Sequence, residues 1–171
     1  MIQKKLVNFL FIILTVFSLK SIAQPYTTGI GLRLGGISSG ITVKHFINSN
    51  NALEGILGFG HESIFVTGLY EKHQPFPKAE GLSWFFGGGA HIGFYNNNYG
   101  EYYYYKHHGN KVIIIDHYDS SVSFGGDFII GMDYKFKDAP VNIALDVKPF
   151  FDIFPGFYGY WEGALTVRFT L

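Results

Sequence analysis

The regular alternation of apolar and polar residues along several long segments constrains the fold of this chain most strongly. In Ser123–Phe136, "SFGGDFIIGMDYKF", large apolar residues fill almost every second position, and mostly small or charged residues fill the positions between them. Successive side chains of a β-strand point to opposite faces of the sheet. The pattern therefore predicts a strand with one apolar face and one small or polar face. Leu82–Tyr95, "LSWFFGGGAHIGFY", follows the same rule.

We expect eight strands, and together they cover most of the chain. They are Thr28–Gly36, Ile41–Ile47, Ala52–Gly60, Ile64–His73, Leu82–Tyr95, Ser123–Phe136, Val141–Phe150 and Glu162–Leu171. Short polar turns follow the second, fourth and sixth strands, whereas the other connections vary and include the long segment 96–121. An even number of antiparallel strands with tight turns at one end predicts an all-β, up-and-down barrel.

The first residues read as an export signal. Lys4 and Lys5 precede the apolar run Leu6–Leu19, which is followed by a site with small residues at Ser21 and Ala23. The run is shorter than the roughly 18 residues expected of a membrane-spanning helix. We therefore expect a cleaved signal peptide over residues 1–23 and a single barrel domain over residues 24–171.

Charge and cysteine content narrow the function classes further. The whole chain has 13 basic and 13 acidic residues, and the predicted signal contains three lysines and no acid, so the mature chain has a formal charge of −3. This charge does not favour a nucleic-acid partner. The chain has no cysteine, which excludes both disulfides and the lipid anchor of a lipoprotein.

The content of the polar face indicates which side of the barrel lies outside. A soluble carrier of the lipocalin type would bury the apolar face, whereas a membrane barrel exposes it to lipid. The small and charged residues suit a narrow interior, and each Arg or Lys that faced lipid would cost roughly 2–4 kcal/mol near the midplane. We expect a lumen closed by an ion-pair network of five cations and five anions: Arg33, Lys44, Lys135, Lys148, Arg168, Glu54, Asp127, Asp133, Asp146 and Glu162. The pattern does not fix the facing of Ile64–His73.

The export signal, the alternating strands and the last strand, "ALTVRFTL", together resemble the small eight-stranded outer-membrane β-barrels, such as the OmpX-like and OmpA transmembrane-domain-like proteins. The resemblance covers Thr27–Leu171. It implies an integral protein of the bacterial outer membrane that contacts lipid and needs no cofactor. The family's final strand usually ends in an aromatic residue, whereas this chain ends in Leu171, with Phe169 two places earlier.

The histidines give no pattern of a catalytic or metal site. The H-E-x-x-H motif is absent, because His61 and Glu62 are followed by "SIF". His61, Glu62 and Ser63 are adjacent in sequence, so their side chains diverge. His91 falls on the luminal face, where it would serve either as a general base or as a hydrogen-bonded member of the ion-pair network, and we expect the second.

The long segment contains "EYYYYKHHGNKVIIIDHY", in which a Gly-Asn pair separates two β-prone runs. We predict a hairpin with Tyr105 opposite Ile114 and Tyr102 opposite His117. This register separates His107 from His117 by about 17 Å, too far for a shared metal ion. The arms are too short to cross a bilayer, so a ten-stranded barrel is the minor alternative. The candidate surface contacts are Tyr102, Tyr103, Tyr104, Tyr105, His107, His108 and His117.

These inferences lead to one expected function and two alternatives. We expect a monomeric, non-enzymatic outer-membrane barrel with a filled lumen. Its role would be surface interaction, adhesion or envelope structure through the extracellular loop 96–121, with an extracellular or envelope protein as partner. The alternatives are an enzyme at the outer rim that modifies lipid and a soluble exported carrier barrel.

Overall fold

The computed structural model describes residues 26–96, 101–107, 110–116 and 122–171, with the backbone alone described in 101–107 and 110–116. The predicted signal peptide, residues 1–23, lies outside the described residues. Within the described part of the chain, no helix is long and apolar enough to cross a membrane.

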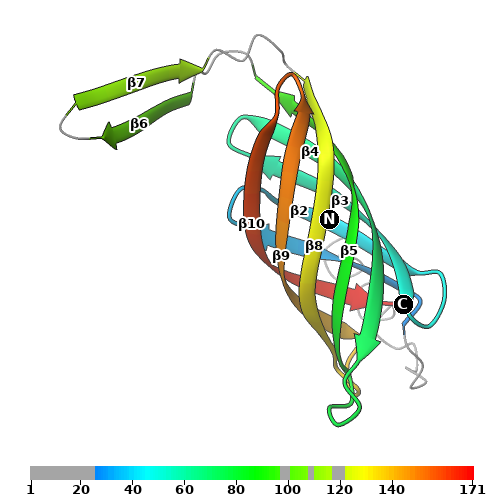
Figure 1. The fold of residues 1–171 in the computed structure, drawn as a ribbon. Helices are drawn as coiled ribbons and strands as arrows, with labels where there is room; N and C mark the ends of the chain where they lie inside the picture. The colour runs from blue at the N-terminus through cyan, green and yellow to red at the C-terminus, as the bar shows by residue number, and fades with distance from the viewer. Residues whose placement is uncertain (1–25, 97–100, 108–109, 117–121) are drawn as a thin grey trace, which may run out of the picture.

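Eight strands form a closed barrel in the order β1-β10-β9-β8-β5-β4-β3-β2, and every neighbouring pair is antiparallel (Figure 1). The barrel strands are β1 (Thr28–Gly35), β2 (Ser39–Phe46), β3 (Asn51–Gly60), β4 (Ser63–Pro75), β5 (Leu82–Tyr95), β8 (Val122–Lys135), β9 (Val141–Phe154) and β10 (Tyr158–Thr170). The prediction of an all-β, eight-stranded, up-and-down barrel is confirmed.

The largest errors in the predicted strand ends concern the last hairpin of the barrel. β9 continues to Phe154 and β10 begins at Tyr158, so the predicted ends at Phe150 and Glu162 are each wrong by four residues. Pro149 lies in the register opposite Trp161 and does not end the strand. The inward and outward alternation continues past it, which extends the barrel wall at this end.

The long segment forms a hairpin of its own, with β6 (Glu101–His107) paired antiparallel to β7 (Asn110–Asp116). This two-stranded sheet is separate from the barrel sheet, so the ten-stranded alternative is wrong (Figure 1). The predicted register is also wrong, because Tyr105 lies opposite Val112 rather than Ile114. Asn110 belongs to β7 and lies opposite His107, so it is not part of the predicted Gly-Asn turn.

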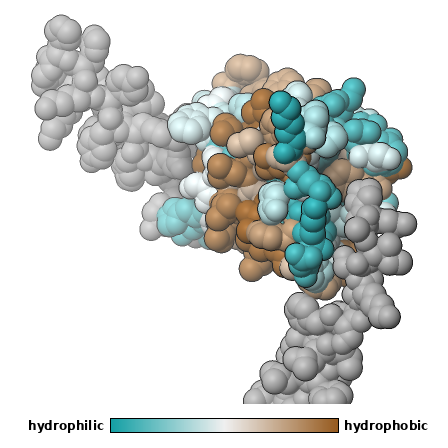
Figure 2. Space-filling model, turned by 90° about the horizontal axis from the view of Figure 1, so that it is seen from below, coloured by the Kyte–Doolittle hydropathy of each residue, from teal (hydrophilic) through white to brown (hydrophobic). Residues whose placement is uncertain are grey.

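The outer wall of the barrel is apolar and the charged residues point inward. Phe128 is 60% exposed and Leu145 is 59% exposed, whereas Arg33 and Lys44 are almost completely buried inside. Figure 2, a view from below, shows apolar residues over much of the visible surface, with hydrophilic residues in a band through the middle and toward the sides. The structure also fixes the facing of β4, where Val66 and Tyr70 point outward. This distribution is the inverse of that in a soluble protein and fits a barrel surrounded by lipid.

Aromatic side chains gather toward both ends of the wall. Toward the end with the short turns, Trp84 stacks on Phe86 with their ring centroids 5.4 Å apart. Toward the other end, Phe124 stacks on Phe154 at 5.5 Å. Aromatic rings in such positions match the interfacial girdles of membrane barrels, which fix the height of the protein in a bilayer.

Ile130 provides a test of the lipid-facing wall, because it points outward near the middle of β8. An Ile130→Arg substitution should lower the free energy of unfolding in lipid vesicles by roughly 2–4 kcal/mol, since it places a cation against hydrocarbon. Urea titration of the vesicle-bound protein measures the change, with Ile130→Leu as the control. Equal stability of the Arg and Leu variants would contradict this orientation.

Candidate functional site

Charged side chains fill the interior of the barrel in two clusters. The mouth cluster lies toward the end with the β1–β2 and β9–β10 connections and contains Arg33, His91, Asp127, Asp146, Lys148, Asp152 and Glu162. The base cluster lies toward the end with the two chain termini and contains Lys44, Glu54, Glu71, His73, Asp133 and Arg168. All of these residues are buried.

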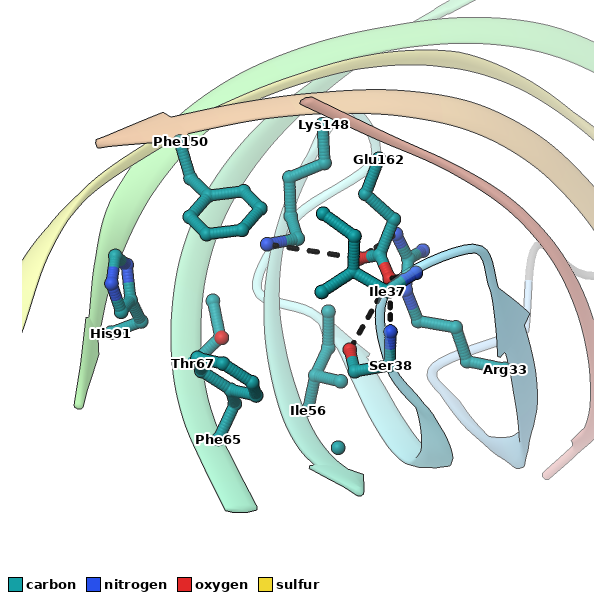
Figure 3. A pocket seen from close by; sticks show the side chains of 11 residues that line it. Arg33, Ile37, Ser38, Ile56, Phe65, Thr67, His91, Lys148, Phe150 and Glu162 are labelled. Atoms are coloured by element: carbon teal, nitrogen blue, oxygen red, sulfur yellow. Dashed lines mark hydrogen bonds and ion pairs between the residues drawn. The ribbon is translucent and has the colours of Figure 1, made fainter. Parts of the chain in front are cut away.

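A chain of ion pairs links four strands in the mouth cluster. The two terminal nitrogens of Arg33 donate to the two oxygens of Asp146 at 2.6 and 2.8 Å. Arg33 and Lys148 both approach Glu162, at 3.6 and 3.9 Å respectively (Figure 3). Lys148 also donates to Asp127 at 2.9 Å. Because these residues come from β1, β8, β9 and β10, the ion pairs connect strands across the lumen.

His91 connects two carboxylates in the same cluster. Its Nδ1 lies 2.8 Å from Asp127 and its Nε2 lies 2.9 Å from Asp152. An ionised carboxylate only accepts hydrogen bonds, so both nitrogens must carry a proton for both bonds to form. The arrangement therefore fits a charged imidazolium that replaces a cation in the network. The rings of Phe65 and Phe150 pack against the imidazole at centroid distances of 6.3 and 5.4 Å.

Glu162 also fixes the connection between β1 and β2 onto the mouth cluster. Its carboxylate accepts hydrogen bonds from the backbone nitrogens of Ile37 and Ser38 at 3.1 and 2.7 Å, and from the Ser38 hydroxyl at 3.3 Å. Figure 3 shows Ile37 and Ser38 folded over the side chains of the lumen. The connection therefore partly covers this end of the barrel.

The base cluster is built around Lys44, which contacts Glu54 at 3.0 Å and Glu71 at 2.7 Å. Arg168 forms a second ion pair with Glu54. His73 lies 3.0 Å from Glu71 and 3.6 Å from Asp133. Asp133 also accepts a 2.5 Å hydrogen bond from Ser83. Five of the eight strands thus contribute charged groups to one connected cluster.

An apolar layer contributed by β3, β4, β5, β8 and β9 also fills part of the interior. Its members are Ile56, Leu69, Phe85, Ile129 and Ala144. Phe85 is completely buried, its ring stacks on His73 at 5.0 Å, and the Lys44 ammonium lies 4.2 Å from its centroid. Gly131 provides the space for this ring, because a Cβ there would lie 2.7 Å from the Phe85 Cζ.

The lumen leaves almost no free space. The cavity among the mouth cluster, Ile37, Phe65 and Phe150 has a volume of about 10 Å³ (Figure 3). This volume is about that needed by a single water molecule. The buried side chains around this cavity therefore leave little room for water in this part of the lumen.

The structure places nine of the ten predicted luminal residues inside the barrel. Lys135 is the exception, because it lies half-buried at the end of β8 and its ammonium donates to the backbone carbonyls of Phe136 and Ala139 at 2.7 and 2.8 Å. The prediction that it belongs to the network is wrong. A long side chain next to a turn reaches backbone acceptors there before it reaches the lumen.

The predicted list also omitted Glu71, His73 and Asp152. The facing of the strand with Glu71 and His73 was open, and the strand with Asp152 was predicted to end at Phe150. The expected balance of five cations and five anions is therefore wrong. The described interior buries seven carboxylates, four permanently charged cations and two histidines. The excess of acid explains why both histidines lie against carboxylates.

The residues predicted as surface contacts lie in or beside the β6–β7 hairpin. Tyr102–Tyr105 and His107 belong to β6, while His108 and His117 lie outside the described residues. His61 and Glu62 form the turn between β3 and β4, with a positive φ of 52° at Glu62. In the part of the chain that the structure describes, no group of three His, Asp or Glu residues is arranged to hold a metal ion.

Asp146 provides a test of the buried network. An Asp146→Asn substitution should lower the free energy of unfolding by roughly 3–5 kcal/mol, because it leaves the buried Arg33 guanidinium without its principal counter-charge. The double variant Arg33→Met with Asp146→Leu should recover much of this loss, since no buried charge is left alone. Urea titration in lipid vesicles measures both effects.

The exposed pair of Lys137 and Glu80 is the matched control, because it forms an ion pair outside the lumen. Lys137→Ala should change the stability by less than about 1 kcal/mol. A loss of similar size for Lys137→Ala and Asp146→Asn would contradict the assignment of the stabilising charges to the lumen.

Comparison with known proteins identifies the fold. The sequence matches no protein-family model, and no curated protein matches it. The structure is similar to the N-terminal β-barrel domain of Pseudomonas aeruginosa OprF, with a TM-score of 0.61 and 13% identity over 86% of this chain and 100% of that domain. It is also similar to Neisserial surface protein A, with a TM-score of 0.48 and 10% identity over 84% of this chain and 94% of that one.

Proposed function

We propose, from the fold that this chain shares with small eight-stranded outer-membrane β-barrels, that it is an integral protein of the bacterial outer membrane. Export would use the signal peptide over residues 1–23. The exposed apolar wall and its aromatic ends support this location, because so large an apolar surface is stable against lipid and unfavourable in water. The same wall argues against the soluble carrier, which would bury its apolar face.

The proposed function is neither transport nor catalysis. The observation that carries this inference is the filled lumen, in which two ion-pair clusters and an apolar layer occupy the interior. His91, the best-placed base near the rim, has a carboxylate on each ring nitrogen and so has no free nitrogen to accept a proton. This geometry makes the lipid-modifying enzyme the weaker candidate.

The proposed role lies instead at the surface, in adhesion or envelope structure through the loop 96–121. β5 and β8 each contain 14 residues, more than the 9–11 that a tilted strand needs to cross a bilayer. These strands can carry the β6–β7 hairpin beyond the membrane. Among the described residues the hairpin pairs only with itself, and an unpaired strand edge is a site where a partner can add a strand.

Deletion of residues 101–118 tests the surface role. The barrel should still fold, because its eight strands pair without this segment. The shortened protein should keep the heat-dependent migration on detergent gels that is typical of folded membrane barrels. Cells that express it should lose any gain in adherence or detergent resistance that the full-length protein gives over empty-vector cells.

Two results would contradict the proposal. If the shortened protein supports adherence and detergent resistance as well as the full-length protein, the loop is not the functional element. If the shortened protein no longer migrates as a folded barrel, the segment belongs to the structure of the barrel itself.

A further inference from the structure

The outer wall of the barrel has an open groove that spans β2 to β5, with a volume of about 580 Å³. Its floor passes over Gly55 and Gly68, which are register partners on β3 and β4. A Cβ at either position would meet nothing within 4 Å. The groove therefore exists because two neighbouring outward positions have no side chain. The outward side chains that line it are those of Val43, His45, Leu53 and Tyr70.

Polar residues of the outer wall gather beside this groove. Lys72 is the exception to the inward facing of the charges: at the outward positions of the eight described barrel strands it is the only Lys, Arg, Asp or Glu. It follows Tyr70 on the same face of β4, toward the end with the short turns. His45 and Tyr70 lie in one row, because both pair in register with Leu53. The His45 Nδ1 lies 2.9 Å from the Thr28 hydroxyl.

The position of Lys72 allows its charge to reach the lipid headgroups. β4 ends at Pro75, three residues after Lys72, so this part of the wall lies close to one surface of the bilayer. A lysine there can place its stem against the apolar wall and its ammonium at the headgroup level, where anionic lipid attracts it. A ligand for this region must therefore combine a negative charge with an apolar chain.

We propose that the groove and Lys72 bind one phospholipid with an anionic headgroup, from the periplasmic leaflet of the membrane that holds the barrel. One acyl chain lies over Gly55 and Gly68, and the Lys72 ammonium donates to the phosphate. When Thr28 donates to Nδ1 of His45, Nε2 carries the proton and is a donor for an ester or phosphate oxygen. The inference rests on the proposed outer-membrane location, since the short turns of such barrels face the periplasm.

The charge of Lys72 favours a lipid over a second copy of this chain. Two barrels related by a two-fold axis present the same patch to each other. A shared groove would therefore bring two Lys72 ammonium groups together beside lipid, where their repulsion is stronger than in water. The groove is also open to the surroundings, so a flexible acyl chain fills it without a matching protein surface.

Native mass spectrometry of the refolded protein in detergent measures the binding of phosphatidylglycerol and of phosphatidylcholine. The unaltered protein should retain one phosphatidylglycerol at a lower concentration than phosphatidylcholine. Gly68→Leu should weaken both lipids roughly tenfold, because the new side chain occupies the space of about two acyl methylenes. Gly159→Leu is the matched control, since Gly159 also points outward into open space, on β10, and its replacement should change neither affinity.

Lys72→Gln separates the headgroup from the acyl chain. The variant should bind phosphatidylglycerol roughly fivefold more weakly and phosphatidylcholine as before, so that the preference between the two lipids is lost. Lys78→Gln is the control for charge alone, because Lys78 is exposed in the turn between β4 and β5 at the same end of the barrel. It should keep the preference.

Three results would overturn the proposal: equal affinity of the unaltered protein for both lipids, equal binding by Gly68→Leu and Gly159→Leu, or equal losses for Lys72→Gln and Lys78→Gln. A two-chain species that Gly68→Leu abolishes would identify a second copy as the occupant instead. Heat-dependent migration after refolding into vesicles separates the two levels of failure. An inserted barrel without a preferred lipid contradicts only the lipid site, whereas a barrel that fails to insert contradicts the proposed location as well.

Discussion

A chain that crosses a bilayer as strands must satisfy every backbone hydrogen bond within itself, because hydrocarbon offers no partner. Here the pairing of β1 with β10 closes the sheet and removes its two open edges. Closure with eight strands also sets the width of the interior, which is just large enough to be filled by side chains. The filled interior of the described barrel follows from this width.

The filled interior determines where function can lie. Seven carboxylates are buried in this space, and four Lys or Arg side chains and two histidines lie buried among them. Pairs such as Arg33–Asp146 and Lys44–Glu71 hold strands together across the lumen, and Phe85 packs against His73 and Lys44 of the base cluster. These buried groups contact one another rather than a ligand. Contacts with soluble molecules are therefore expected at the two ends of the barrel.

The sequence predicted the fold and most of the interior because alternation is a local signal. Asp127 and Phe128 illustrate this signal. Because adjacent residues of a strand point to opposite faces, this pair predicts which face is luminal and which is outward. The alternation does not assign the two faces of "IFVTGLY" in β4, because both sets of alternate positions contain apolar residues. The facing of Glu71 and His73 was therefore left open. Asp152 was missed because its strand was predicted to end at Phe150. The hairpin register was wrong by two residues because the Gly-Asn pair predicted the turn, whereas Asn110 belongs to β7.

The central claim is that charged residues face inward and apolar residues face lipid along each strand. Spin labels placed singly at positions 128–133 of β8, in protein refolded into vesicles, test it directly. The account predicts that labels at even-numbered positions collide with oxygen, which concentrates in lipid, and that labels at odd-numbered positions do not. Accessibility without a two-residue period, or with odd-numbered positions facing lipid, would contradict it.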